Sequence, residues 1–261
     1  MHDLTALIFD VDGTLADTER DGHRLAFNRA FRDAGLDWDW SPALYGELLA
    51  VTGGKERIRF YLDRYNRDFS RPADLDGFIA GLHAAKTAHY TELLATGAIP
   101  LRPGVERLLR EARDAGLRLA IATTTTPDNV TALLRYSLAE DAESWFEVIA
   151  AGDVVPAKKP SPAIYTYALE RMKLRPDAAL AFEDSYNGLR SSLGADLATI
   201  VTVNDYTRDH DFAGASLVLD HYGEPELPFT VLSGDAGGER WLTLDLLRDL
   251  HARQQRRARV G

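Results

Sequence analysis

Short apolar runs recur along the chain, and each ends in polar residues. Most runs are continuous rather than alternating, which is typical of strands buried on both faces of a parallel sheet. Segments of helical length lie between them, so strand and helix alternate as in a doubly wound α/β domain. The predicted strands are Thr5–Phe9, Leu117–Ala122, Val148–Ala150, Ala179–Phe182, Thr199–Val203 and Leu217–Leu219, and the predicted helices are Val105–Ala115, Asn129–Tyr136, Ala163–Met172 and Asn187–Leu193.

One region breaks this alternation. Between about residues 19 and 97 the apolar positions have helical spacing and no convincing strand pattern. Such a stretch is too long for a simple crossover and indicates an inserted helical domain. The link back to the sheet, residues 97–103, is rich in Gly and Pro and is typical of a hinge. The predicted fold is therefore a mainly parallel α/β core of residues 1–18 and 98–261, interrupted by an all-helical domain of residues 19–97.

The C-terminal part gives a weaker pattern. Residues 224–228 and 233–238 are predicted to be loops, and Leu242, Leu246, Leu247 and Leu250 predict a final amphipathic helix. The chain then ends in a basic segment, which is either a solvated helix tail or an arm that binds phosphate or a partner. Its arginines are Arg253, Arg256, Arg257 and Arg259.

Composition narrows the functional classes. The chain has no cysteine, so it has no disulfide, thiolate metal site or cysteine nucleophile. Its 30 Lys and Arg against 40 Asp and Glu give a net charge of −10, which argues against nucleic-acid or anionic-membrane binding but leaves an anionic small substrate possible in one cleft. The start, Met1–Leu4, lacks the basic residues of a signal peptide, and no run reaches the roughly 18 apolar residues of a membrane span. We expect a soluble, cytoplasmic protein and a monomer.

The sharpest chemical feature follows the first predicted strand. Asp10 and Asp12 lie two positions apart, so both would project from the carboxyl end of that strand, where open α/β sheets bind ligands. Gly13 permits a sharp turn there. Two close carboxylates repel each other, which favours a bound cation or a shared proton. The alternative is an Asp-Gly turn in which one acid caps a helix.

A second acid pair, Glu183 and Asp184, directly follows the strand 179–182. If that strand is parallel to the first, both pairs meet at one edge of the sheet, and their oxygen ligands suit Mg²⁺. The alternative is an acid cluster that stabilises a helix N-terminus.

Two further features complete this edge. Thr123 ends the strand 117–122, where a hydroxyl and backbone N–H groups hold phosphate oxygens well, although an ordinary N-cap would look the same. Lys159, in a Lys-Lys-Pro loop, would neutralise a phosphoryl group if it lies at the edge, but it could equally be a solvated loop lysine.

Taken in order, these features resemble the four motifs of the haloacid dehalogenase-like hydrolases, and the helical insert resembles the small cap of that family. The motifs correspond here to Phe9–Leu15, Ile121–Thr123, Lys159-Pro160 and Glu183–Ser185. The resemblance extends to the CbbY-type phosphatases, which hydrolyse xylulose-1,5-bisphosphate, an inhibitor of Rubisco. The segments similar to that group are Thr18–Arg24, Leu44–Leu49, Gly53–Ile58, Leu101–Val105 and Ala150–Val155.

The resemblance implies a role for each acid. Asp10 would attack phosphorus and form an aspartyl-phosphate. Asp12 would protonate the leaving alkoxide and then accept a proton from the hydrolytic water. Mg²⁺ would be held by Asp10, the main-chain carbonyl of Asp12 and Asp184, with Glu183 supporting it through water.

The remaining expected site residues bind substrate. Thr123, Thr124 and Lys159 would hold the phosphoryl oxygens. The cap would contact the phosphorylated sugar through Glu19, Tyr45, Gly53, Gly54 and Lys55, with Lys55 on a second, distal phosphate.

Three cap residues have alternative interpretations. Tyr45 could instead belong to the cap core. Arg57 either assists Lys55 or faces solvent. His23 is expected to pack at the hinge or orient the cap rather than to catalyse.

Two other functions are compatible with this sequence. One is a β-phosphoglucomutase-like phosphosugar mutase or another small sugar-phosphate phosphatase, since the motifs are nearly the same. The other is a catalytically silent binding protein, which the intact set of acids disfavours.

Overall fold

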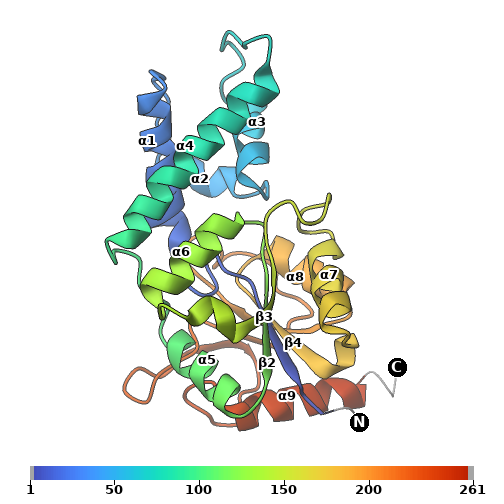
Figure 1. Cartoon of the computed structure of the whole chain (residues 1–261). Helices are drawn as coiled ribbons and strands as arrows, with labels where there is room; N and C mark the ends of the chain where they lie inside the picture. Colours follow the sequence, from blue (N-terminus) through green and yellow to red (C-terminus); the bar gives the residue numbers. More distant parts are fainter. Residues whose placement is uncertain (1–2, 258–261) are drawn as a thin grey trace.

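The computed structural model describes residues 3–257, in which a sheet flanked by helices carries a separate layer of helices (Figure 1). The described sheet has seven strands in the order β3-β2-β1-β4-β5-β6-β7, all parallel except β7. The predicted doubly wound α/β fold is confirmed. The strands are β1 (Ala6–Phe9), β2 (Arg118–Ala122), β3 (Phe146–Ala150), β4 (Ala179–Glu183), β5 (Ala198–Thr202), β6 (Leu217–Leu219) and β7 (Val231–Gly234).

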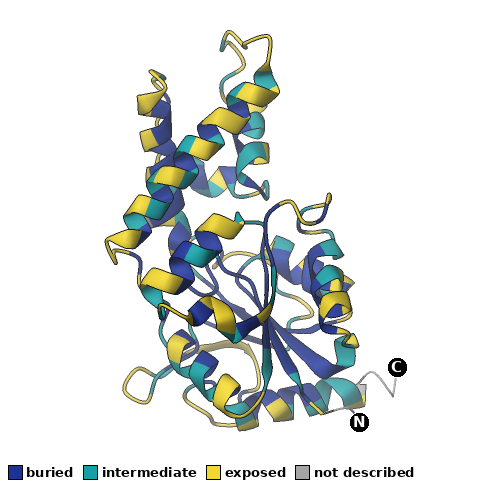
Figure 2. Ribbon diagram, in the orientation of Figure 1, coloured by how far each residue is buried: buried dark blue, intermediate teal, exposed yellow. Residues whose placement is uncertain are grey.

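Two apolar clusters cover the two faces of the sheet, because successive residues of a strand point to opposite sides. In β1, Leu7 and Phe9 belong to one cluster and Ala6 and Ile8 to the other. Helices α5 (Val105–Asp114), α6 (Pro127–Ser137) and α9 (Leu244–Arg257) pack on the Leu7 side. Helix α7 (Ala163–Met172) packs on the Ile8 side of the sheet, and helix α8 (Tyr186–Gly194) contacts α7. Figure 2 shows the strands as the most buried layer. Two short 3-10 helices are η2 (Ala142–Trp145) and η3 (Pro176–Ala178).

Strand β7 corrects the sequence prediction of a loop over residues 233–238. Its residues Ser233 and Gly234 pair with β6 in antiparallel fashion. All four residues of β7 are exposed, so no apolar run marks the strand in the sequence. An exposed, short edge strand is stabilised by backbone pairing alone, which an apolar pattern does not report.

The helical layer has a core of its own. It comprises η1 (Glu19–His23, a π-helix), α1 (Arg24–Asp33), α2 (Pro42–Leu48), α3 (Gly54–Arg64) and α4 (Leu75–Ala95). Within described residues 19–97 there is no strand, as predicted. Its buried cluster contains Phe27, Phe31, Trp38, Trp40, Tyr45, Leu48, Ile58, Leu62, Ile79 and Leu82. The exact domain division at residues 18/19 and 97/98 stays a prediction.

The final helix is also present. Leu246, Leu247 and Leu250 are buried in α9, as the pattern predicts, and Leu242 is buried just before it. Arg259 of the basic segment lies outside the described residues. Within residues 3–257, no helix combines the length and apolarity that a membrane crossing requires.

Candidate active site

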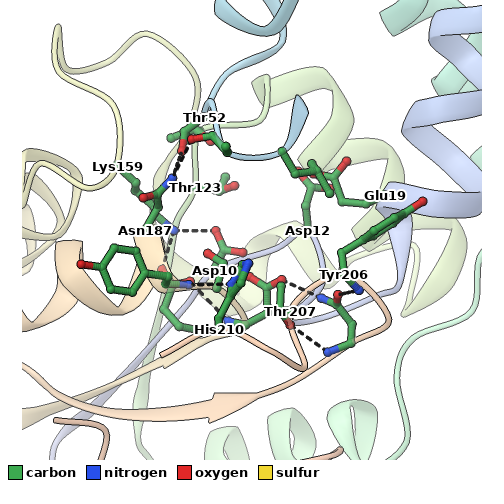
Figure 3. A pocket seen from close by; sticks show the side chains of 18 of the residues that line it. Asp10, Asp12, Glu19, Thr52, Thr123, Lys159, Asn187, Tyr206, Thr207 and His210 are labelled. Atoms are coloured by element: carbon green, nitrogen blue, oxygen red, sulfur yellow. Dashed lines mark hydrogen bonds and ion pairs between the residues drawn. The ribbon is translucent and has the colours of Figure 1, made fainter. Parts of the chain in front are cut away.

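Three parallel strands end at one edge of the sheet. Phe9 in β1 is in register with Ile121 in β2 and with Phe182 in β4. The residues that follow these positions therefore converge around one cavity of about 430 Å³. Figure 3 shows side chains from the sheet and the helical layer around it. Of the predicted site residues, the cavity is lined by Asp10, Asp12, Glu19, Thr123, Thr124, Lys159, Glu183 and Asp184.

Lys159 joins the two acid pairs. Its Nζ donates to Oδ1 of Asp10 and to Oε1 of Glu183, both at 2.6 Å. The hydroxyl of Tyr165 donates to the same Glu183 oxygen at 2.5 Å. Burial alone would lower the pKa of Lys159, but the two carboxylates more than offset it and raise that pKa above its usual value. Lys159 is thus a buried cation, and the solvated-loop alternative does not apply.

Three buried carboxylates form a cluster that fits a divalent cation. Ligand oxygens of Asp10, Glu183 and Asp184 lie within 4.8 Å of one another. Burial raises the pKa of Asp10 to about 7, with Lys159 opposing and Glu183 reinforcing the shift. Burial likewise raises the pKa of Asp184 well above its usual value, and Asp10 adds to the shift. With all three groups ionised, the carboxylates would outnumber the one ammonium, and a hard cation such as Mg²⁺ would offset the excess in place of the protons that the raised pKa values favour.

The turn after Asp10 packs directly on this cluster. Gly13 has φ +83°, and a Cβ there would lie 2.3 Å from Oδ2 of Asp184. Only glycine fits this backbone conformation and this close approach. The side chain of Asn204, which follows β5, donates to the same oxygen of Asp184 at 2.7 Å.

Asp12 has different surroundings from Asp10. Thr18 Oγ1 donates to Oδ1 of Asp12 at 2.6 Å, and Nε2 of His23 lies 2.7 Å from the same oxygen. Burial would raise the pKa of Asp12, but the charge and hydrogen bond of His23, together with Thr18 and Lys86, hold it below its usual range. Both acids line one cavity, yet Asp10 faces Lys159 whereas Asp12 faces the helical layer.

The buried lysine Lys86, from α4, completes a chain that starts at Asp12. Its Nζ lies 2.7 Å from Nδ1 of His23. Burial lowers the pKa of Lys86 to about 8, although the carboxylates of Asp12 and Glu19 oppose that shift. We expect His23 to pack at the hinge or to orient the cap. It lies at the end of η1, the first element of the helical layer, and it also contacts the Asp12 carboxylate directly.

Tyr45 corrects the prediction that this residue lines the cleft. Its side chain is fully buried, and its ring lies 6.0 Å from that of Trp40. The hydroxyl donates to Oε2 of Glu19 at 2.5 Å and accepts from Arg57 at 2.8 Å. Tyr45 therefore belongs to the cap core, since the aromatic cluster takes up its ring, and it reaches the cavity only through Glu19 and Arg57.

The side chain of Arg57 is buried and lines the cavity, so the solvent-facing alternative is wrong. Lys55, two positions earlier in α3, points elsewhere, because residues two apart do not share a helix face. Its Nζ forms an ion pair with Asp153 at 2.8 Å. Gly53 and Gly54 line a smaller cavity of about 50 Å³ that also borders Asp12 and Glu19.

Several residues of this site were not among the sequence candidates. Asn204 directly follows the predicted strand 199–203, so the strand-end argument could have found it. Lys86 continues the helical pattern of α4 and carries no local signal of its contact with His23. The loop after β5 adds further residues to the lining of the 430 Å³ cavity, namely Tyr206, Thr207, Asp209, His210 and Asp211.

Comparisons with known proteins agree with this geometry. The sequence profile of the haloacid dehalogenase-like hydrolases matches residues 4–196. The protein CbbY, plasmid, of Cupriavidus necator is 46% identical over 248 residues, which are 95% of this chain and 97% of the relative. A CbbY variant from Rhodobacter sphaeroides, solved in complex with xylulose-1,5-bisphosphate, is 50% identical with a TM-score of 0.78, over 84% of this chain and 94% of that one. A β-phosphoglucomutase of Clostridium difficile, 19% identical with a TM-score of 0.72 over 97% and 98% of the two chains, shares the fold.

The chain belongs to the haloacid dehalogenase-like hydrolases. These relatives confirm two predictions: the chain resembles the CbbY-type group, and it is a phosphatase.

Proposed function

We propose that this protein is a Mg²⁺-dependent phosphatase of sugar bisphosphates that works through an aspartyl-phosphate on Asp10, with xylulose-1,5-bisphosphate as its substrate. The observation that carries the proposal is the contrast between two carboxylates of one cavity. Asp10 is bound by Lys159 beside two further acids, whereas Asp12 is held by His23. Two acids in unlike surroundings are typical of a nucleophile paired with an acid–base group. Bound Mg²⁺ would offset the burial that raises the pKa of Asp10, so that Asp10 attacks as a carboxylate.

Asp10 acts first. One of its carboxylate oxygens attacks phosphorus, and the bond between phosphorus and the sugar oxygen breaks. Lys159 and the hydroxyl of Thr123, with the backbone near Thr124, orient and neutralise the phosphoryl oxygens. Bound Mg²⁺ would supply the positive charge that offsets repulsion between the Asp10 carboxylate and the phosphoryl group.

Asp12 moves the proton in both halves of the reaction. The protonated form of Asp12 donates to the departing sugar oxygen, and the carboxylate that it leaves takes a proton from the water that attacks the aspartyl-phosphate, so the proton returns to Asp12 in each cycle. That second attack releases phosphate and restores Asp10. The contact with His23 favours the ionised form, so in this proposal Asp12 is protonated once substrate is bound rather than in the free protein. The contact with His23 fixes the Asp12 carboxylate at the cavity wall formed by the helical layer.

The metal ligands in this proposal are Asp10, Asp184 and the main-chain carbonyl of Asp12. Their chemistry suits Mg²⁺, which takes oxygen ligands and keeps some of its waters. Glu183 accepts hydrogen bonds from Lys159 and Tyr165, so its part is to support the cluster.

The helical layer, residues 19–97, acts as the cap in this proposal. Glu19 and the glycines Gly53 and Gly54 line cavities beside the acids and would contact the sugar. Lys55 would exchange Asp153 for the distal phosphate. The cap also excludes water while the aspartyl-phosphate exists.

Phosphate release from a panel of sugar monophosphates and bisphosphates, with and without Mg²⁺, tests the proposal. We expect xylulose-1,5-bisphosphate to be hydrolysed fastest, Mg²⁺ to be required, and Asp10→Asn to abolish turnover. Asp114→Asn, which removes an exposed carboxylate on α5, is the matched control and should keep full activity. Retained activity in Asp10→Asn would remove the covalent mechanism.

A further inference from the structure

Arg102 is a buried cation on the link that returns from the helical layer to the sheet. Its guanidinium donates to main-chain oxygens from three separate segments of the core. The acceptors are the carbonyl of Gly13, the carbonyl of Thr202 at 3.2 Å, the carbonyl of Val203 at 2.5 Å and the carbonyl of Asp220 at 2.6 Å. Asp17 is its carboxylate partner at 3.4 Å, and that side chain is 62% exposed.

This arrangement needs an arginine. Burying a cation is costly unless its donors are all bonded, and here carbonyl oxygens rather than a buried carboxylate satisfy them. The guanidinium presents five N–H donors in a rigid plane, so it can reach carbonyls that diverge from one another. A lysine ammonium has three donors on one nitrogen, so it cannot replace all four bonds to carbonyls that the guanidinium makes.

Two of the three bonded segments shape the acid cluster. Gly13 begins the turn that directly follows Asp10 and Asp12, and it packs against Asp184. Val203 precedes Asn204, whose side chain donates to Oδ2 of Asp184 at 2.7 Å. Arg102 therefore connects the nucleophile turn on one side with the support of Asp184 on the other.

Arg102 also anchors the link itself. Its backbone N–H donates to the carbonyl of Leu15 at 2.9 Å, and the preceding Leu101 pairs with Ala16 as an isolated antiparallel bridge. The guanidinium lines a second cavity of about 330 Å³, together with Gly13 and Asn204, whereas Asp10 and Asp12 line the first. Arg102 thus lies behind the acid turn, where it acts through the backbone it holds and through its charge, which opposes the rise in the pKa of Asp184.

We propose that Arg102 is a positioning residue, whose guanidinium fixes the turn of Asp10 and Asp12 against Asp184 and so sets the geometry of the Mg²⁺ site. This rests on the proposed role of Mg²⁺. Residues that orient metal ligands without touching the metal contribute strongly to affinity and activity. Arg102 is of this kind, one layer behind the ligands.

The test is Arg102→Lys, with Mg²⁺ binding measured by calorimetry on the free protein and kcat and KM measured separately. We expect the Mg²⁺ Kd to rise and kcat to fall by about 10- to 100-fold each, with KM within about threefold of the original. The matched control is Arg107→Lys in α5. Arg107 also donates to main-chain carbonyls, those of Gly223 and Leu242 at 2.8 Å, but neither belongs to the acid turn. Arg107→Lys should leave the Mg²⁺ Kd and kcat unchanged.

Asn204→Ala provides an independent variant, because it removes the contact with Asp184 and leaves the bonds of Arg102 in place. It should weaken Mg²⁺ binding in the same direction, and the double variant should lose less than the sum of the two losses. An unchanged Mg²⁺ Kd in either single variant overturns the proposal, as do equal losses in Arg102→Lys and Arg107→Lys. If the original protein does not bind Mg²⁺, the proposed metal-dependent function fails instead.

Discussion

The Nε2 atom of His23 lies 2.7 Å from Oδ1 of Asp12, and its Nδ1 atom lies 2.7 Å from Nζ of Lys86. This relationship links the acid–base group of the proposed mechanism to helix α4 of the cap. Any shift of the cap relative to the sheet would therefore move the partners of Asp12. The contact gives the cap a part in the chemistry as well as in enclosing the substrate.

Replacing His23 by alanine tests this link. His23→Ala removes the group that orients the Asp12 carboxylate, so we expect kcat to fall at least about tenfold. The loss should be smaller than in Asp12→Ala, which removes a general acid–base contribution of about 10²–10⁴ in rate. His89→Ala is the control. Nε2 of His89, in α4, lies 2.7 Å from Oδ2 of Asp33, and neither residue lines the cavity of Asp12. Steady-state kinetics decide the matter, and an unchanged kcat in His23→Ala would remove its role.

Gly188 offers a test of the acid cluster that leaves every charged group in place. It lies in the first turn of α8, and a Cβ there would come within 1.7 Å of Oε2 of Glu183. Gly188→Ala would displace that carboxylate from Lys159, so we expect kcat to fall by about 10- to 100-fold. The experiment compares kcat with thermal stability.

The matched control is Gly81→Ala in α4, where no atom lies within 4 Å of the added Cβ. It should leave kcat unchanged and raise the free energy of unfolding by up to about 1 kcal/mol. Equal activity in Gly188→Ala and Gly81→Ala would show that the position of Glu183 is unimportant.

The sequence was sufficient for the residues at the strand ends. Asp10, Thr123 and Glu183 follow continuous apolar runs, and parallel strands bring such positions to one edge. The sequence marks Arg102 only as part of a hinge and of a segment similar to the CbbY-type phosphatases. It does not reveal the burial of Arg102, because that burial depends on carbonyls about 90 to 120 positions away in the chain. Tyr45 was misassigned for a similar reason: a local pattern cannot distinguish a cleft from an aromatic cluster that gathers rings from several helices.

The ion pair of Lys55 with Asp153 predicts competition with a distal phosphate. Asp153→Asn frees Lys55, and since an exposed pair contributes about 0–1 kcal/mol, we expect KM for a bisphosphate to fall by up to about fivefold. Lys55→Ala should raise the same KM by about tenfold, the scale of one charge-assisted hydrogen bond. Both variants should change KM for a sugar monophosphate little. Equal effects on the two substrates would rule out the distal-phosphate role of Lys55.

His83 predicts how stability depends on pH. Burial lowers the pKa of His83 to about 3, and the charges of Lys86 and Lys55 act in the same direction. An unfolded histidine has a pKa of about 6.5, so between these values the unfolded chain binds more protons. The contribution of neutral His83 is therefore complete above about pH 6.5 and is lost as the pH falls toward 3. We expect Tm to fall less between pH 7 and 4.5 in His83→Gln than in the original protein, and parallel curves would contradict this.

The central claim is that water, rather than a second sugar, accepts the phosphoryl group of the Asp10 aspartyl-phosphate, and that the substrate is a sugar bisphosphate. The most direct measurement compares initial rates, with Mg²⁺, of phosphate release from xylulose-1,5-bisphosphate and of conversion of glucose 1-phosphate to glucose 6-phosphate. We predict rapid phosphate release and negligible conversion. Conversion of glucose 1-phosphate that is faster than hydrolysis of any bisphosphate would contradict the account and identify a mutase.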